Sequence, residues 1–403
     1  MEELEGYGGE VLKRLKEAGV QVGDVIRVEK PHQAFEGTLI PKTHAGEDEY
    51  LVIKLESGYN VGIKCTAETR IRLLRRGVRP AFKKPPIPQK SETLPRIAVI
   101  TTGGTIASRV DYRTGGVEPA LGAEDLYSIF PELSAIAQIE AQVLFSEFSE
   151  NITAEHYGLM ARSAAAAIRS GAQGVVICHG TDTLGYTSAA LSFALRNLPA
   201  PVVLVGSQRS SDRPSSDAAT NLIGAVDTAA QAPFAEVCVA MHETLSDQTL
   251  AIHIGTKVRK CHTSARSAFK SVNAPLLARS GISDRRLTMV REDYRKRGLE
   301  GDLKVEDEFD ERVALLKFYP GMSPDLLEWH LDRQVRGVII EGSGLGHVSK
   351  PLQKPIERAA LEGVFVGMTS QCLWGRVNMQ VYSTGRDLLR LGVTPLEDML
   401  PET

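Results

Sequence analysis

The sequence predicts an α/β protein in which a parallel-sheet core of two domains follows a small N-terminal β-barrel. Near-continuous apolar segments alternate with alanine-rich helical segments over residues 96–284, the pattern of a parallel sheet that is covered on both faces. Residues 1–84 instead carry short strand-like segments joined by glycine-containing turns, which is typical of a small barrel. Residues 85–95 are rich in proline and predict an extended linker between the two parts.

The individual elements follow from hydrophobic periodicity and from turn residues. In residues 1–84 we expect one helix at 10–18, a strand-like segment at 20–28 that is interrupted by a turn signal at Gly23 and Asp24, and strands at 50–55 and 60–63. In residues 96–284 the predicted strands are 96–101, 175–178, 201–206 and 236–241, and the predicted helices are 154–170, 183–195 and 216–231. The charged residues 285–311 predict an exposed connection. Residues 312–403 then predict a smaller α/β domain with strands at 313–318, 338–340 and 364–368.

Composition excludes several classes of protein. The formal net charge of −3 provides no overall field for binding nucleic acid, although RNA contact through a local patch or a partner stays open. No apolar run approaches the roughly 20 residues of a membrane span, and the acidic N-terminus is unlike a signal peptide. The five cysteines occur singly, which argues against a disulfide framework or a zinc site. We therefore expect a cytoplasmic protein without a metal site.

Two short segments carry the chemistry. Residues 101–108 read TTGGTIAS and residues 179–184 read HGTDTL, and each segment follows an apolar strand. Ligands of open α/β sheets bind at the carboxyl ends of the strands. The two hydroxyl-rich loops are therefore expected to form one pocket that can hold a nucleophile and its activating groups.

The first segment has two further interpretations. Gly103 and Gly104 allow the backbone to approach a ligand and to present amide groups to an oxyanion. A phosphate-binding loop is disfavoured because the lysine of that motif is absent. A tight strand-to-helix turn with capping threonines is the structural alternative.

The second segment places His179, Thr181 and Asp182 within four positions. Asp182 could bind a cationic group such as a substrate ammonium or a lysine. Alternatively, Thr181 or Asp182 caps a helix and His179 is a satisfied core residue.

A basic strip at residues 257–266, reading KVRKCHTSAR, also allows several interpretations. It could contact phosphate, form a solvated face, or direct one lysine inward to activate a threonine hydroxyl. The glycine-rich loop at residues 342–346 lacks the spacing of a dinucleotide fingerprint, so we expect a tight loop there.

Together the segments resemble the asparaginase/glutaminase family of amidohydrolases over residues 95–403. Residues 102–107 and 179–183 resemble the two threonine motifs of that family. Further similarity lies at residues 206–209, 216–217, 221–222, 269–273, 370–372, 377–379 and 382–385. The resemblance implies an asparaginase-like two-domain fold and an acyl transfer in which a threonine attacks the side-chain amide.

The resemblance assigns Thr105, Thr181, Asp182 and Lys260 to the catalytic set. The segment at 269–273 fixes the register that selects Lys260 rather than Lys257. Our preferred roles make Thr105 the nucleophile and the other three residues its relay. The opposite assignment, with Thr181 as the nucleophile, stays open.

The resemblance also implies substrate contacts at Gly104, Ser149, Glu150 and Tyr112. Backbone amides near Gly104 and Thr181 are the expected oxyanion donors. The chain departs from the family pattern at Tyr112, whose offset does not match both family branches. It also carries Leu345 where periplasmic relatives have an asparagine.

The N-terminal barrel narrows the resemblance to the D-subunit family of archaeal glutamyl-tRNA(Gln) amidotransferases. That resemblance implies a glutaminase that supplies ammonia to an E subunit, a transamidase that binds glutamyl-tRNA(Gln) and uses ATP and Mg²⁺. It implies no cofactor in this chain, a homodimer through the asparaginase-like core, and a heterotetramer with the transamidase. The substrate would be L-glutamine or L-asparagine. A stand-alone cytoplasmic L-asparaginase is the alternative, and a binding protein on an inactive scaffold is disfavoured by the intact catalytic set.

Overall fold

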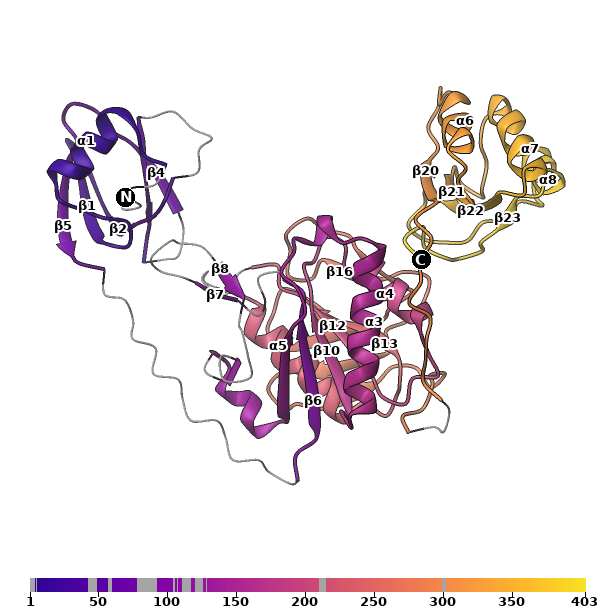
Figure 1. Cartoon of the computed structure of the whole chain (residues 1–403), viewed down its shortest axis with the longest axis horizontal. Helices are drawn as coiled ribbons and strands as arrows, with labels where there is room; N and C mark the ends of the chain where they lie inside the picture. Colours follow the sequence, from indigo (N-terminus) through magenta and orange to yellow (C-terminus); the bar gives the residue numbers. More distant parts are fainter. Residues whose placement is uncertain are drawn as a thin grey trace.

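A computed structural model gives the arrangement of the chain. It describes residues 4, 6–42, 49–56, 60–77, 93–103, 106, 108–110, 117–119, 126–127, 129–209, 215–298 and 302–403. Figure 1 shows three bodies in chain order: an N-terminal sheet with one helix, a larger α/β domain and a smaller α/β domain. Most of the predicted linker, residues 85–92, lies outside the described residues.

The N-terminal body is a five-stranded antiparallel sheet with the strand order β4-β3-β2-β1-β5. Its elements are α1 (Gly9–Glu17), β1 (Val25–Lys30), β2 (Gln33–Leu39), β3 (Tyr50–Lys54), β4 (Asn60–Lys64) and β5 (Arg70–Arg75). Alternate residues such as Ile26 and Val28 are buried beneath α1, as the period of a strand requires. The predicted strand at 20–28 begins only at Val25, because Asp24 accepts a hydrogen bond from the Gln21 amide in a turn.

The larger domain is built on an eight-stranded sheet with the order β18-β17-β14-β13-β12-β10-β6-β9. The parallel strands are β6 (Arg96–Thr101), β9 (Gln138–Val143), β10 (Gly174–Cys178), β12 (Val202–Val205) and β13 (Val237–His242). The antiparallel strands are β14 (Thr249–Ile254), β17 (Ala278–Gly281) and β18 (Leu287–Met289). The predicted strands β6, β10, β12 and β13 are confirmed, whereas β9 and the antiparallel extension were not predicted.

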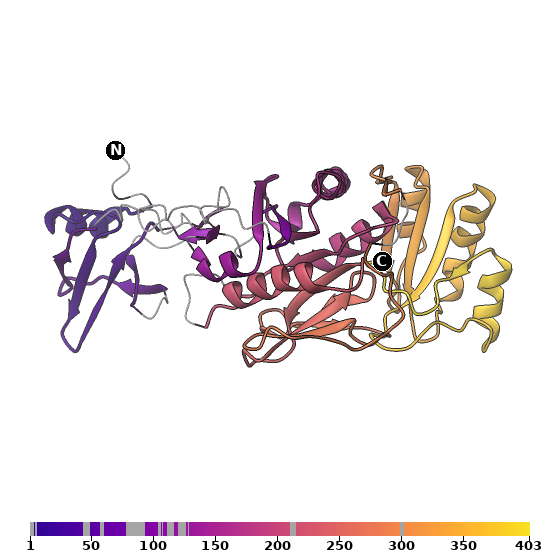
Figure 2. The ribbon, with the colours of Figure 1, turned by 90° about the horizontal axis from the view of Figure 1, so that it is seen from below.

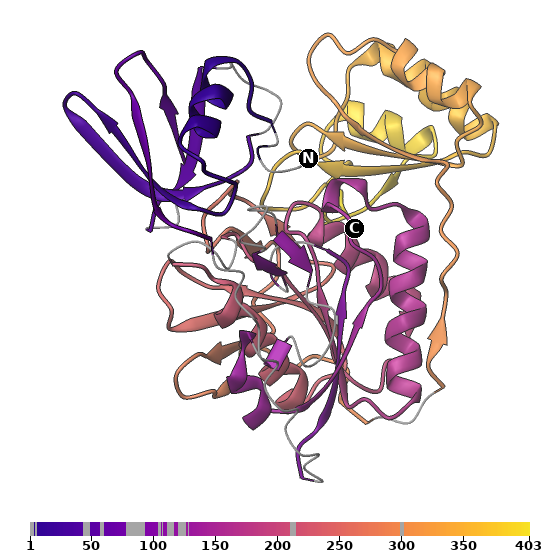
Figure 3. The same cartoon turned by 60° about the vertical axis from the view of Figure 1, so that its left-hand side comes forward.

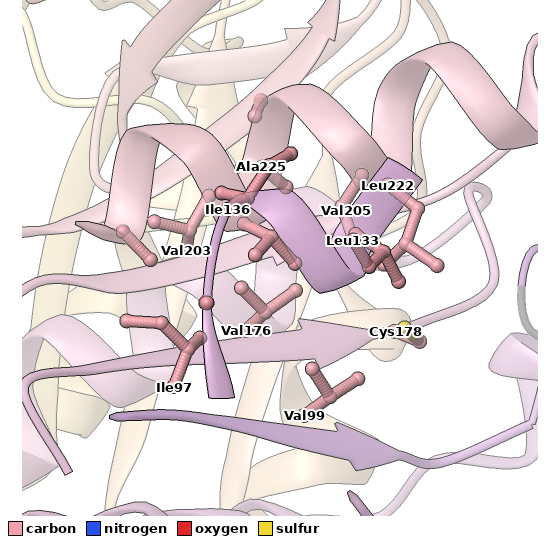
Figure 4. Close-up of a cluster of buried hydrophobic side chains, with 14 of the residues drawn as sticks. Ile97, Val99, Leu133, Ile136, Val176, Cys178, Val203, Val205, Leu222 and Ala225 are labelled. Atoms are coloured by element: carbon pink, nitrogen blue, oxygen red, sulfur yellow. The ribbon is translucent and has the colours of Figure 1, made fainter. Parts of the chain in front are cut away.

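Helices cover both faces of this sheet. The helices α3 (Ala154–Arg169) and α4 (Leu184–Ala194) pack on the face that includes Ala98 and Ile100. The helix α5 (Ala218–Gln231) and the 3₁₀ helix η1 (Pro131–Ala135) pack on the opposite face. Figure 4 shows the second of these cores, where Leu222 and Ala225 of α5 lie against strand residues such as Val176 and Val203.

The predicted exposed connection at 285–311 is partly wrong. It contributes β18 to the main sheet, and β19 (Lys304–Val305) pairs with β11 (Leu195–Arg196). Leu303 is buried in the core beside α3. Single apolar residues among many charges produce no periodicity, so these short pairings were not recognisable in the sequence.

One 3₁₀ helix and two short strand pairs lie outside the main sheet. The 3₁₀ helix η2 (Ser149–Asn151) follows β9, and β15 (Val258–Lys260) pairs with β16 (Phe269–Ser271) as a separate hairpin. A further pair is formed by β7 (Ser108–Val110) and β8 (Val117–Pro119).

The smaller domain is a four-stranded parallel sheet with the order β20-β21-β22-β23. Its elements are β20 (Val313–Lys317), α6 (Asp325–Asp332), β21 (Gly337–Gly342), η3 (Lys350–Leu352), α7 (Gln353–Leu361), β22 (Phe365–Ser370), α8 (Ser383–Arg390) and β23 (Thr394–Pro395). Figure 2 shows the helices on the side of this sheet that faces away from the larger domain. The loop at 342–346 is tight, as expected, because the Ser343 amide bonds to His347 and Gly346 adopts a φ of +99°.

Two general properties complete the fold. Across the described ranges, no helix has the length and apolar character that crossing a bilayer requires. All five cysteines are free thiols.

Candidate active site

The two threonine loops begin side by side at the carboxyl edge of the sheet. Thr101 at the end of β6 is paired with Cys178 at the end of β10. The next residue, Thr102, donates its amide and its hydroxyl to the Cys178 carbonyl, at 3.1 and 2.9 Å. Gly103 has a φ of +111°, and a Cβ there would lie 2.3 Å from the Glu147 carbonyl oxygen. Only glycine fits this close approach, so the first loop is held against the segment after β9.

His179 is a structural residue in the second loop. Its imidazole is buried, with Nδ1 2.7 Å from the Gly180 carbonyl and Nε2 2.9 Å from the Thr187 hydroxyl. Because a carbonyl only accepts, we assign the ring proton to Nδ1, and Nε2 then accepts from Thr187. Burial lowers the pKa of His179 to about 4. The core interpretation of this histidine is therefore the one that the structure shows.

Thr181 lies on the loop between β10 and α4, and the chain after β12 packs directly against it. A Cβ on Gly206 would lie 2.7 Å from Thr181 Cγ2 and 2.9 Å from the His179 carbonyl oxygen. The absence of a side chain at position 206 thus permits the contact that orients Thr181.

Lys260 joins the two predicted residues of the second loop. Its Nζ donates to Thr181 Oγ1 at 2.9 Å and to Asp182 Oδ1 at 2.7 Å. The lysine side chain is 14% exposed and the Asp182 side chain is 69% exposed. The hydroxyl, the ammonium and the carboxylate therefore form one hydrogen-bonded unit at the carboxyl edge of the sheet.

Two other basic residues of the strip contact the end of the smaller domain. Lys257 Nζ lies 2.8 Å from Asp398 Oδ2, and Arg259 Nε lies 2.8 Å from Glu402 Oε1. Of the two lysines, it is Lys260 that contacts Thr181 and Asp182, and its catalytic role stays a prediction. Residues 261–264 of the same strip are exposed to solvent.

The remaining predicted site residues divide into two groups. Ser149 is buried in η2, its carbonyl accepts from the Thr183 hydroxyl at 2.6 Å, and its side chain lies against Gly180. Glu150 beside it is exposed. Gly104, Thr105 and Tyr112 lie outside the described residues.

A buried polar network supports the loop that packs on Thr181. Asp217 accepts from the amides of Gln208 and Arg209, at 3.0 and 2.9 Å. Asn221 donates to the Gly206 carbonyl and to Asp217, both at 2.9 Å. Asp217 and Asn221 are both completely buried, so these bonds form away from water, where leaving them unmade is costly.

The network continues to the hairpin that carries Lys260. His242 lies 2.6 Å from Asn221 Oδ1 and 2.9 Å from Asp247, and Asp247 accepts from Arg266 at 2.6 Å. Hydrogen bonds to His242 and Arg266 hold the pKa of Asp247 below its usual value. No local pattern in the sequence indicates this connection, because its members lie on three separate segments.

The described residues contain no group of three or more His, Cys, Asp or Glu side chains placed to hold a metal ion. What the described geometry offers is a hydroxyl hydrogen-bonded to a lysine, which is an arrangement for proton transfer to or from an attacking oxygen.

Comparison with known proteins places this geometry in a class. Family models match the chain as "Asparaginase, N-terminal" over residues 96–293, "Glutaminase/Asparaginase C-terminal domain" over 312–403, and "GatD N-terminal domain" over 20–74. The L-asparaginase of Thermococcus kodakarensis superposes with a TM-score of 0.66 at 34% identity, covering 76% of this chain and 89% of that one. L-asparaginase I of Vibrio cholerae gives 0.66 at 30% identity, covering 77% and 90%. The fold and the site therefore define an asparaginase-type amidohydrolase.

Relatives of nearly full length define the family within that class. The D subunit of the glutamyl-tRNA(Gln) amidotransferase of Methanothermobacter thermautotrophicus is 49% identical, over 98% of this chain and 90% of that protein. The same subunit of Pyrococcus furiosus is 50% identical, over 96% and 89%. The chain belongs to the D-subunit family of glutamyl-tRNA(Gln) amidotransferases.

Proposed function

We propose that this chain is the glutaminase subunit of a tRNA-dependent amidotransferase that converts Glu-tRNA(Gln) to Gln-tRNA(Gln). It hydrolyses the side-chain amide of glutamine and supplies ammonia to a partner, the transamidase. The observation that carries the proposal is the contact of Lys260 Nζ with both Thr181 Oγ1 and Asp182 Oδ1. Family membership, which includes the N-terminal domain, selects the amidotransferase among the uses of such a site.

The described residues suggest how a proton moves. When Lys260 is neutral, its amine can accept the proton of the Thr181 hydroxyl across 2.9 Å. The Asp182 carboxylate, 2.7 Å away, stabilises the ammonium that results. Because Asp182 is largely exposed, it can also contact the ammonium group of a bound substrate.

The reaction is an acyl transfer in two halves. A threonine oxygen attacks the amide carbon, the C–N bond breaks, and the nitrogen leaves as ammonia after gaining a proton. Water then attacks the resulting ester and releases glutamate. Our preferred nucleophile is Thr105, with Thr181, Lys260 and Asp182 as its relay; Gly104, Ser149, Glu150 and Tyr112 are proposed to contact the substrate.

The proposal extends to partners. The transamidase, an E subunit of the same amidotransferase, would bind glutamyl-tRNA(Gln), would use ATP and Mg²⁺ to activate the glutamyl group, and would receive the ammonia. This chain would form a homodimer through its asparaginase-like core and a heterotetramer with the transamidase in the cytoplasm. No cofactor is assigned to this chain.

A stand-alone L-asparaginase is the second candidate, because the structures described above as similar are L-asparaginases. The N-terminal domain and the family membership favour the amidotransferase.

The test is ammonia release from glutamine and from asparagine, measured with the chain alone and then with the transamidase, ATP, Mg²⁺ and glutamyl-tRNA(Gln). We expect hydrolysis that rises when the complex and its tRNA are present. Constitutive asparagine hydrolysis that ignores partner and tRNA would favour the second candidate, and no amide hydrolysis under any condition would refute both.

A further inference from the structure

The strand that carries Lys260 is bonded on its other side to the end of the smaller domain. The ion pairs Lys257–Asp398 and Arg259–Glu402 connect the two, each at 2.8 Å. The Thr403 hydroxyl donates to the Thr256 carbonyl at 2.8 Å. Figure 3 shows the chain end marked C beside the larger domain, consistent with these contacts.

Asn273, just beyond the hairpin, adds to the same junction. Its side-chain amide donates to the Gly375 carbonyl at 2.7 Å, and its oxygen accepts the Gly375 amide at 2.9 Å. These bonds fix the hairpin to the smaller domain independently of the two ion pairs.

The ion pair of Arg259 with Glu402 is the part of this junction that adjoins Lys260 and is partly buried. Successive side chains of a strand point to opposite sides, so Arg259 faces the smaller domain while Lys260 faces Thr181. The Glu402 side chain is only 9% exposed, and its Oε2 is buried with no hydrogen-bond partner among the described residues. A poorly solvated carboxylate depends strongly on the cation beside it, because the charge would otherwise be left uncompensated.

Glu402 also lies close to the helix that follows Thr181 and Asp182. Burial and then the negative charge of Glu402 raise the pKa of the Tyr186 hydroxyl on α4. A Cβ on Gly185 of the same helix would lie 3.1 Å from the Val258 carbonyl oxygen. The carboxylate therefore lies near β15, which carries Lys260, and near the N-terminal turn of α4, which follows the loop of Thr181 and Asp182.

We propose that Glu402 is a positioning residue for the amide hydrolysis, acting through its ion pair with Arg259. The pair holds β15 in the position at which Lys260 Nζ donates to Thr181 Oγ1 and Asp182 Oδ1 together. The smaller domain thus contributes to the chemistry of a site whose described members all lie in the larger domain. This inference rests on the proposed function.

The consequence concerns turnover more than substrate affinity. A displacement of Lys260 by about 1 Å would weaken both hydrogen bonds and slow proton transfer, and misplacements of that size can reduce rates on the order of a hundredfold. The substrate contacts proposed at Ser149 and Asp182 lie on other segments and are not moved directly. The expected signature is a lower kcat with little change in KM.

The experiment uses the full chain, alone and assembled with its partner, and measures kcat and KM for amide hydrolysis in the wild type and its variants. Glu402→Gln keeps the shape and an acceptor for Arg259 but removes the charge, and we expect kcat to fall about tenfold with KM within about twofold. A double variant with the pair exchanged, Arg259→Glu with Glu402→Arg, should have a kcat close to that of the wild type. Arg259→Glu alone should have a low kcat.

Glu362→Gln is the matched control, since it removes the same charge from an exposed ion pair with Arg358 in the same domain. It should leave kcat and KM unchanged. Suppose that the wild type is active, Lys260→Met is inactive, and Glu402→Gln turns over normally. That result would overturn the positioning role of Glu402 but leave the proposed function standing. Equal losses of kcat in Glu402→Gln and Glu362→Gln would also overturn the positioning role. So would an exchanged pair whose kcat does not recover. A wild type without any amide hydrolysis would instead refute the proposed function together with this inference.

Discussion

At the scale of single residues, identical side chains acquire different roles from what they face. Lys257 and Lys260 are three positions apart, yet one pairs with Asp398 of the smaller domain and the other with Thr181 and Asp182. Composition alone could not separate them, because both belong to one basic strip. The strand geometry of β15 and the similarity at residues 269–273 do separate them.

The first prediction compares these two lysines. Lys260→Met removes the amine next to Thr181 at nearly constant volume, so glutamine hydrolysis should fall by about three orders of magnitude or more. Lys257→Met removes a contact to the smaller domain and should reduce kcat by less than about tenfold. Steady-state ammonia release measures both, and circular dichroism verifies the fold. A severe loss in Lys257→Met beside near-normal Lys260→Met would show that the register is misplaced.

The second prediction concerns Gly206. A methyl group there would come within 2.7 Å of Thr181 Cγ2 and 2.9 Å of the His179 carbonyl oxygen, closer than such atoms approach. Gly206→Ala should therefore displace Thr181, lower kcat by at least about tenfold, and destabilise the fold by about 1–3 kcal/mol. Gly62→Ala is the control, since a Cβ at Gly62 meets no atom of the described residues within 4 Å. Normal turnover in Gly206→Ala would show that Thr181 does not need this contact.

At the scale of elements, the parallel strands were predictable and the hairpin geometry was not. Continuous apolar runs such as residues 174–178 give a strong signal, and they fix where the Thr181 loop must lie. The hairpin of β15 and β16 has only three residues in each strand and is dominated by charge. Its position depends on contacts with distant partners, which no local pattern encodes. The sequence could therefore name Lys260 only through a family resemblance.

The third prediction concerns histidines buried within two elements. Burial lowers the pKa of His179 to about 4, while burial and then the charge of Lys270 lower the pKa of His253 on β14 to about 3. Both values lie below the ordinary 6.5, so the unfolded chain binds these protons at higher pH than the folded chain does. Stability from both residues is present above pH 6.5 and is lost as the pH falls toward their folded values. As the pH falls from 7 to 5, each histidine should lower the free energy of unfolding by about 2 kcal/mol.

Urea unfolding across that range measures the effect. His253→Gln keeps a polar partner for Ser271, whose hydroxyl lies 2.8 Å from His253 Nδ1, but cannot titrate. Between pH 7 and pH 5, the free energy of unfolding of this variant should fall by about 2 kcal/mol less than that of the wild type. His32→Gln, at an exposed position, should leave the slope unchanged. An identical slope in wild type and His253→Gln would contradict the assignment.

At the scale of the whole molecule, the parts of the chain have separate hydrophobic cores. The hydrophobic core of the N-terminal body is formed by its own residues, such as Leu15, Ile26 and Ile53. The two faces of the main sheet and the smaller domain have their own clusters. By contrast, the two C-terminal domains are joined by ion pairs and hydrogen bonds. These connect residues 256–259 with residues 398–403, and Asn273 with Gly375. The described members of the site lie in the larger domain, beside this junction.

The fourth prediction follows from that division. A chain that begins at Ser91 retains β6 and every described residue of the candidate site, so it should fold and keep the basal amide hydrolysis of the full chain. It lacks the domain that distinguishes this family from the similar L-asparaginases, whose structures cover only 76–77% of this chain. Stimulation by the transamidase and glutamyl-tRNA(Gln), or affinity for the transamidase, should therefore be lost.

Paired measurements of basal and stimulated ammonia release on the full and shortened chains test this division, with a melting curve to verify the fold. A substitution in the N-terminal core that leaves the rest of the chain intact provides the control: Ile26→Ala creates a cavity at a completely buried position and should cost about 2–5 kcal/mol in that domain. It should weaken stimulation while sparing basal hydrolysis, because the catalytic core has its own clusters. Full stimulation of the shortened chain would assign the N-terminal domain a role outside assembly. Loss of basal hydrolysis in a shortened chain that still melts cooperatively would mean that the N-terminal domain helps to form the site itself.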